Sequence, residues 1–248
     1  MPGRTLLGMI TPSSNTVLEP LTGLMLADLY PGVTAHFSRF RVTEISLEQA
    51  ALDQFDLAPI MSAAELLADA MPASIAWNGT SASWLGFDRD EQLCREIENQ
   101  TGIPAVTSVL AINEILTVRG VTRIGLVTPY TSDVQQRIVR NYRSLGIDCI
   151  ADAHFGERNN FAFAEFGEPY LEQRIREVAA SKPQAVIVLC TNLRAAQLVS
   201  RLELETNIPI YDSIAAVVWK ALIQAGIETD TLANWGSLFS LKHDGDMQ

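Results

Sequence analysis

The sequence predicts an α/β protein built from two similar Rossmann-like lobes, each a parallel sheet covered by helices, with a functional site between the lobes. Two observations support this prediction. Short apolar runs alternate with longer helical patterns along the 248 residues, and several runs, such as Ala185–Cys190, are apolar at every position. Runs of that kind are typical of parallel strands that are buried on both faces. The second observation is that segments of the first half of the chain reappear in the second half.

The expected strands form two sets of four. In the first half they span Thr5–Thr11, Val33–Phe40, Ser74–Trp77 and Ala105–Ser108, and in the second half Arg123–Thr128, Ile147–Ala153, Gln184–Cys190 and Ile208–Tyr211. Helical patterns lie between the strands, over Leu47–Ala70, Asp88–Gln100, Ser132–Ser144, Tyr170–Ala180 and Ala195–Glu205. This alternation is the pattern of α/β proteins, in which helices cover both faces of the sheets.

Three pairs of segments match between the halves, in the same order and with slowly shrinking spacing. The pairs are Gly8–Ser14 with Gly125–Thr131, Ile75–Thr80 with Val186–Thr191, and Thr101–Pro104 with Thr206–Pro209. Such matches indicate a duplicated unit of about half the chain. The alternative is chance, because strand–turn–helix segments resemble one another. We therefore expect a first lobe at residues 1–116 and a second at 117–248, with a C-terminal segment that could cross over to the first lobe.

Composition and charge argue against several classes of protein. The 18 Lys and Arg residues against 29 Asp and Glu give a net charge of −11, which disfavours a nucleic-acid partner because phosphates would be repelled. No run of about 18 apolar residues is present, so we expect no membrane span. The three cysteines, at positions 94, 149 and 190, indicate neither a disulfide framework nor a zinc site. This cysteine usage fits a reducing cytoplasm, and the histidines show no metal spacing. Since no GxGxxG or Walker pattern occurs, we expect no nucleotide cofactor.

Four polar loops are expected to form the functional site. Ligands of open α/β sheets bind beyond the carboxyl ends of the strands, and that rule selects Thr11–Thr16, Gly79–Ser83, Thr128–Asp133 and Cys190–Arg194. Backbone N–H groups and hydroxyls at such strand–helix junctions form an anion receptor that needs no lysine. Each loop alone is also an ordinary helix cap, so the prediction depends on all four meeting in one cleft.

Cys190 is the cysteine with a possible chemical role, because it ends the most apolar strand and opens one of these loops. We expect a helix N-terminus nearby, which would favour the thiolate. The alternative is a small buried apolar residue, as most free cysteines are. Cys94 lies within a helical pattern and Cys149 within a strand, and we expect both to be structural.

These loops resemble the aspartate/glutamate racemase superfamily. The segments that carry the resemblance are Pro12–Thr16 with Glu19, Gly79–Ser83, Thr128–Tyr130 and Cys190–Arg194. The maleate cis-trans isomerases and arylmalonate decarboxylases are the branch most similar to this chain, and the ectoine-utilization relatives are another branch that it resembles. The resemblance covers nearly the full chain. It implies a two-lobed, cofactor-independent enzyme whose cleft binds a small carboxylate, and a homo-oligomer.

The sequence departs from the racemases and maleate isomerases at one catalytic position. Those enzymes carry two cysteines, one from each half, whereas this chain has Cys190 in the second half and Gly79 in the first. Arylmalonate decarboxylases are similar to this chain at both positions. Asn15, however, matches an amide of the maleate isomerases, and Asn160, in preference to Asn159, is expected to match a second.

The leading functional hypothesis is a decarboxylase-type lyase that forms an enediolate and protonates it from Cys190. The substrate is expected to bind through Thr80, Ser81, Tyr130, Thr131 and the amide of Thr191, with Asn15 and Asn160 at a second polar end. Two alternatives stay open: an isomerase or racemase in which another group replaces the missing thiol, and a carboxylate-binding protein with reduced activity. Replacing Gly79 by cysteine is expected to place a thiol opposite Cys190 and raise racemisation.

A homo-oligomer is expected on one further ground besides the resemblance. The segment Ile214–Ile223 is strongly apolar, and an apolar helix near the end of the chain could meet its copy across a two-fold axis, the commonest symmetry of soluble oligomers. The alternative is that this helix belongs to the core.

Overall fold

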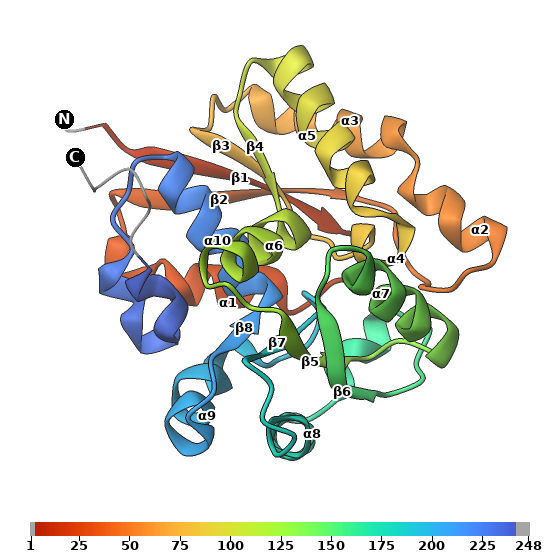
Figure 1. Ribbon diagram of the computed structural model, residues 1–248. Helices are drawn as coiled ribbons and strands as arrows, with labels where there is room; N and C mark the ends of the chain where they lie inside the picture. Colours follow the sequence, from red (N-terminus) through yellow and green to blue (C-terminus); the bar gives the residue numbers. More distant parts are fainter. Residues whose placement is uncertain (1–2, 242–248) are drawn as a thin grey trace.

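The computed structural model describes residues 3–241, so residues 1–2 and 242–248 of the predicted lobe ranges lie outside it. It contains two four-stranded parallel sheets with the orders β2-β1-β3-β4 and β6-β5-β7-β8 (Figure 1). The first sheet comprises β1 (Thr5–Pro12), β2 (Val33–Phe40), β3 (Ser74–Trp77) and β4 (Ala105–Thr107), and the second comprises β5 (Arg123–Thr128), β6 (Asp148–His154), β7 (Ala185–Val188) and β8 (Ile210–Asp212). The identical strand order confirms two similar α/β lobes.

The register of the sheets reproduces the sequence repeat. Gly8 of β1 lies opposite Ile75 of β3, and Gly125 of β5 lies opposite Val186 of β7. The sequence repeat aligns Gly8 with Gly125 and Ile75 with Val186. The aligned residues therefore occupy equivalent places in the two sheets, and the repeat seen in the sequence is a structural repeat.

Both repeat glycines are required by close packing. A Cβ atom on Gly8 would lie 3.2 Å from Cγ of Pro72, and one on Gly125 would lie 2.3 Å from Cγ1 of Val178. A larger residue at position 125 would therefore have to displace Val178 of α8, and one at position 8 would crowd Pro72.

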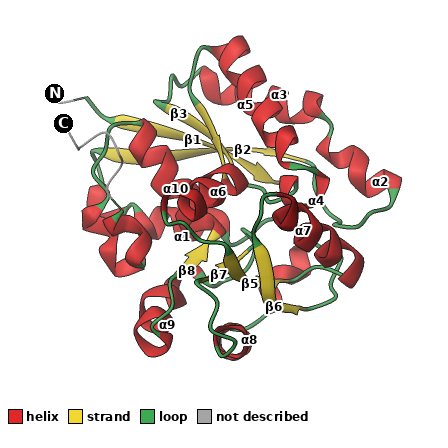
Figure 2. Ribbon diagram, viewed as in Figure 1, coloured by secondary structure: helices red, strands yellow, loops and turns green. Residues whose placement is uncertain are grey.

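Helices cover both sheets (Figure 2). The α-helices are α1 (Leu18–Met25), α2 (Gln49–Leu52), α3 (Leu57–Ala68), α4 (Ala82–Leu85), α5 (Phe87–Thr101), α6 (Ser108–Val118), α7 (Ser132–Ser144), α8 (Glu168–Ala179), α9 (Val199–Thr206) and α10 (Ser213–Gln224). Short 3₁₀ turns occur at η1 (Ala27–Leu29), η2 (Asp53–Phe55), η3 (Phe161–Glu165), η4 (Ala196–Leu198), η5 (Asp230–Trp235) and η6 (Ser237–Ser240). Within residues 3–241, none of these helices has the length and apolar character needed to cross a membrane.

The predicted helix Leu47–Ala70 is wrong in its continuity. The segment forms α2, the turn η2 and then α3, with an extended residue at Asp56 between them. Pro59 gives the reason, because proline has no N–H and is tolerated only in the first turn of a helix. Since α3 begins at Leu57, Pro59 falls in that first turn.

The last long helix, α10, packs against first-lobe elements. It contacts α6, β3 and β4, and in Figure 1 it lies beside α6 next to the first sheet. Ser74 donates a hydrogen bond to Gln224 (2.9 Å), and Lys220 forms an ion pair with Glu114 (2.6 Å). We retain the lobe boundary near residue 117 as a proposal, and this packing supports the crossover of the C-terminal segment.

The same packing changes the interpretation of the apolar segment Ile214–Ile223. Most of its side chains are buried within the chain, including Val217, Trp219 and Leu222. The segment is therefore core, and it gives no support to a contact with a second copy. The homo-oligomer stays a prediction that rests on the family resemblance alone.

Candidate active site

The four polar loops meet between the two lobes and are joined by hydrogen bonds. Nδ2 of Asn15 donates to both the carbonyl oxygen and Oγ1 of Thr191, at 3.1 Å each. Oγ1 of Thr191 in turn donates to the carbonyl oxygen of Asn78 (2.9 Å), and the hydroxyls of Thr80 and Tyr130 lie 2.6 Å apart. Each loop that the sequence selected in one lobe thus contacts a loop of the other.

A small cavity lies where these loops meet, with about 20 Å³ of space for water-sized molecules. One wall is formed by the loops, through Gly79, Thr80, Ser81, Tyr130, Asn160, Cys190 and Thr191. A second part of the wall is apolar, through Pro12, Val42, Ile45, Phe55, Trp77 and Trp84. The structure therefore brings seven of the nine expected site residues to one cavity.

The other two expected residues, Asn15 and Thr131, do not line it. The side chain of Asn15 is fully engaged: its amide nitrogen holds Thr191, and Oδ1 accepts from the N–H groups of Val17 (3.0 Å) and Leu18 (2.9 Å). Asn15 thus holds Thr191 in position, and its contact with substrate stays a prediction. Thr131 is the residue before α7 and lies outside the cavity wall.

Of the two neighbouring asparagines, Asn160 is the one that faces the cavity. It is buried, and its Nδ2 donates to Oγ of Ser14 (2.8 Å). Asn159 is exposed, and its Oδ1 accepts from the N–H of Phe161 (3.0 Å).

The polar wall has the features of an anion receptor. Among the described residues, the backbone N–H groups of Thr80, Ser81 and Thr191 donate to no protein acceptor. Buried N–H groups require a partner, and a carboxylate would provide one. Within residues 3–241 no charged side chain lines the cavity, so a bound carboxylate would be held by N–H and hydroxyl dipoles.

Cys190 lies on this wall with its thiol protonated. Burial raises the pKa of the thiol to about 12, although hydrogen bonds from the N–H of Asn192 (3.4 Å) and from Tyr130 oppose the shift. The expected helix N-terminus is absent, because the residues after Cys190 form turns and α9 begins only at Val199. The expectation of a stabilised thiolate was therefore wrong. A protonated thiol is a poor nucleophile and a possible proton donor.

A second hydroxyl group contacts Cys190. The Tyr130 hydroxyl lies between Oγ1 of Thr80 and the sulfur of Cys190, and burial raises its pKa well above the usual value. Thr80, Tyr130 and Cys190 thus form a chain of proton-bearing groups along one wall. The other two thiols lie elsewhere, with Cys94 in α5 and Cys149 in β6, and burial raises their pKa values to about 12.

Gly79 owes its identity to a neighbouring ring. Its φ is outside the left-handed region, so backbone strain does not require glycine there. A Cβ atom would instead lie 2.0 Å from Cζ2 of Trp77. The indole, which also packs on Phe40 with ring centroids 5.1 Å apart, occupies the space of a residue-79 side chain.

Sequence reasoning placed Trp77 at the end of a strand and missed its position in the site. A signal was present, because residues two apart in an extended segment point to the same face, and Trp77 precedes Gly79 by two.

Val42 and Ile45 were also missed. They belong to a segment of the first lobe that pairs with the second lobe through an antiparallel bridge between Glu44 and Asn159. The N–H of Ile45 donates to the carbonyl oxygen of Arg158 (2.8 Å). Such an isolated bridge has no periodic sequence pattern, so nothing in the sequence indicated it.

Comparison with known proteins places the chain in a family. The family description of arylmalonate decarboxylases matches residues 7–239. The chain belongs to this family. It is 24% identical to the maleate isomerase of Alcaligenes faecalis, over 94% of this chain and 96% of that protein. It is 23% identical to the arylmalonate decarboxylase of Bordetella bronchiseptica, over 92% of this chain and 97% of that protein. Among solved structures, a mutant Nocardia farcinica maleate cis-trans isomerase with a covalently bound succinylcysteine intermediate superposes with a TM-score of 0.85 at 21% identity, covering 97% of this chain and 100% of that one.

Membership of the arylmalonate decarboxylase family confirms the resemblance drawn from the loops. The relatives bear the names of two activities, and both belong to the branch that the loop motifs indicated. The protein is therefore an enzyme of this branch, an isomerase or a decarboxylase.

Proposed function

We propose that the protein is a decarboxylase-type lyase that removes CO₂ from a small malonate-type acid and protonates the resulting enediolate from Cys190. The observation that supports this proposal is the asymmetry of the cavity. One wall carries the protonated thiol of Cys190. The position that bears a second thiol in the two-cysteine relatives is Gly79 here, and the indole of Trp77 covers it. This arrangement suits donation of one proton from one side.

The two walls suit the two carboxylates of such a substrate. The retained carboxylate would lie on the N–H groups and hydroxyls of Thr80, Ser81 and Thr191, where preorganised donors stabilise the enediolate oxygens by about 3–4 kcal/mol for an essential hydrogen bond. The departing carboxylate would face the apolar wall at Val42 and Ile45. A charged group loses hydration there, whereas neutral CO₂ does not, so this wall favours the loss of CO₂.

The proton and electron balance closes with this chain's own groups and water. The electrons of the breaking C–C bond enter the enediolate as CO₂ leaves. The S–H proton of Cys190 then moves to the α-carbon, which forms a C–H bond and leaves a thiolate. Because burial makes that thiolate unfavourable, it regains a proton from water before the next turnover, and the hydroxyls of Thr80 and Tyr130, the second of which contacts the sulfur, would relay it. No cofactor is needed.

The proposal is tested by incubating the enzyme in D₂O with methylmalonate, phenylmalonate and maleate. We expect CO₂ release from a malonate and one deuterium at the α-carbon of the product. Cys190→Ser is expected to lose about 10²–10⁴-fold in turnover, because serine is a much weaker acid. Cys94→Ser and Cys149→Ser serve as matched controls and should retain turnover. Conversion of maleate to fumarate without any CO₂ from malonates would contradict the proposal, as would full activity of Cys190→Ser.

A further inference from the structure

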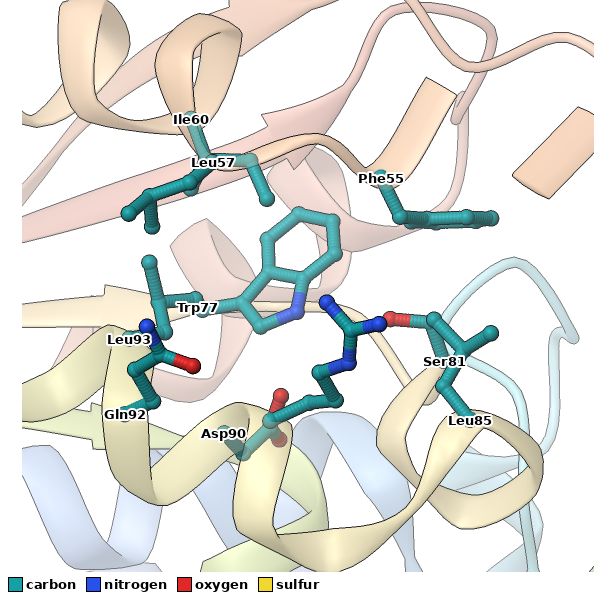
Figure 3. Close-up of a pocket in the computed structure, with 10 residues that line it drawn as sticks. Phe55, Leu57, Ile60, Trp77, Ser81, Leu85, Asp90, Gln92 and Leu93 are labelled. Atoms are coloured by element: carbon teal, nitrogen blue, oxygen red, sulfur yellow. The ribbon is translucent and has the colours of Figure 1, made fainter. Parts of the chain in front are cut away.

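The catalytic cavity adjoins a larger side pocket. The side pocket has about 80 Å³ of space for water-sized molecules, four times that of the catalytic cavity, and Phe55, Trp77 and Ser81 line both. Figure 3 shows the indole of Trp77 between the walls of the side pocket, with Leu57 and Ile60 of α3 on one side and residues of α5 on the other. Trp77 is therefore the partition between the two spaces.

The catalytic cavity is small with the indole of Trp77 in this position. A water molecule needs about 10–15 Å³ by this kind of measure, so 20 Å³ holds little more than one water. Among the described residues, none forms a hydrogen bond with the indole nitrogen of Trp77. The ring is held by packing against Phe40 and Gly79. A substrate that shifts the indole toward the side pocket would join the two spaces, because Trp77 lines both.

The side pocket contains a buried carboxyl group without a full set of partners. Asp90 of α5 is 2% exposed, and its Oδ2 has no hydrogen-bond partner. Burial raises the pKa of Asp90 to about 7, and one hydrogen bond with Thr107 opposes the shift. In Figure 3 the carboxyl group points toward the nitrogen edge of the Trp77 indole. A buried acceptor without a partner is costly, so a donor in this pocket would be favoured.

We propose that the side pocket is a second substrate subsite, in which Oδ2 of Asp90 accepts a hydrogen bond from a neutral hydroxyl or amide group at the far end of the substrate. The inference rests on the proposed function, which places the reacting carboxylate in the catalytic cavity. The apolar walls at Leu57, Ile60 and Leu93 suit a hydrocarbon arm between the two ends. Arg89, exposed at the edge of the pocket, disfavours an ammonium group relative to a neutral donor.

The test is a ligand series titrated into the full-length enzyme by calorimetry at pH 8. The ligands are straight-chain carboxylic acids of equal length whose far end is methyl, hydroxyl, amide, ammonium or carboxylate. We expect the hydroxyl and amide acids to bind about three- to tenfold tighter than the methyl acid, and the carboxylate-ended acid to bind no tighter than the methyl acid.

Asp90→Asn changes the acceptor into a donor while keeping an oxygen for Thr107. In this variant the carboxylate-ended acid is expected to gain about fivefold over the methyl acid. Asp88→Asn, an exposed neighbour on the same helix, should leave the wild-type order unchanged. Equal binding of the methyl and hydroxyl acids by the wild type would overturn the proposal. So would tightest binding of the carboxylate-ended acid, which would assign the pocket to Arg89. Both outcomes are read on the wild type, whether or not Asp90→Asn folds.

Failure of the subsite and failure of the proposed function give different results. The series measures binding, and Cys190→Ser should show the same ligand order as the wild type. If the order is as expected but malonates release no CO₂, the decarboxylase proposal fails and the subsite stands. If malonates react but the order is flat, the subsite alone is refuted.

Discussion

Replacing Gly79 by cysteine tests whether the first-lobe position can accept a thiol at all. The ideal Cβ lies 2.0, 2.4 and 2.6 Å from three atoms of the Trp77 indole, whereas carbon atoms in contact lie about 3.5–4.0 Å apart. The ring must therefore move by about 1.5 Å in a packed interior. Overpacking of this size costs about 1–3 kcal/mol, and we expect the upper end, about 3 kcal/mol. In a protein of this length that lowers Tm by about 6–12 °C.

The matched variant is Trp77→Val, which gives β3 the residue that the repeat places at the end of β7. Alone, it should destabilise by about 3 kcal/mol through the cavity it leaves. In the double variant the new side chain fills part of that cavity, so the two losses should not add. We expect a favourable coupling free energy of at least about 2 kcal/mol.

The assay is urea unfolding of the wild type, both single variants and the double variant, which together form a double-mutant cycle. Activity provides an independent readout: only the double variant should exchange the α-proton of a 2-substituted acid from both faces and racemise it. Additive losses, within about 0.5 kcal/mol, would refute the reasoning that the indole occupies the thiol position. A stable Gly79→Cys variant with unchanged Tm would refute it as well.

Two further predictions concern stability. Asn15→Ala should lower the free energy of unfolding by about 1–3 kcal/mol, because it removes the hydrogen bond to Thr191 and the acceptor for two N–H groups. Asn15→Asp keeps the acceptor and should lose less. Urea unfolding of both variants and the wild type measures the difference. Asp90 and Asp212, whose pKa values burial raises to about 7, bind protons more readily in the folded than in the unfolded state. The free energy of unfolding should therefore rise as pH falls from 8 to 6, by about 1 kcal/mol per group. Asp212→Asn should weaken this trend. A Tm that rises with pH over this range would contradict the raised pKa values of these two carboxyl groups.

The sheets were predictable because their signals are local and strong. Four-residue strands such as Ala185–Val188 are apolar throughout, and the repeat glycines Gly8 and Gly125 aligned the halves in the register that the structure shows. The polar loops were predictable for the same reason: parallel strands bring their carboxyl ends to one edge, whatever the loop residues are.

The missed features depend on contacts between distant segments. The acidity of Cys190 depends on its burial under both lobes, which outweighs the local N–H groups that a loop pattern reveals. The amide nitrogen of Asn15 is engaged by Thr191, which lies across the lobe boundary and could not be paired with it from the sequence. The bridge at Glu44 and Asn159 joins segments with no periodicity in common.

The repeat explains why one lobe carries a thiol and the other does not. Val188 and Cys190 of the second lobe correspond to Trp77 and Gly79 of the first. In each pair the residues are two apart. The indole of Trp77 occupies the space that a side chain at position 79 would need, whereas the corresponding residue of the second lobe is the smaller Val188. The absence of a thiol at position 79 thus goes together with the large side chain at position 77. We therefore expect that a thiol at position 79 is accommodated only when Trp77 is also replaced by a smaller residue.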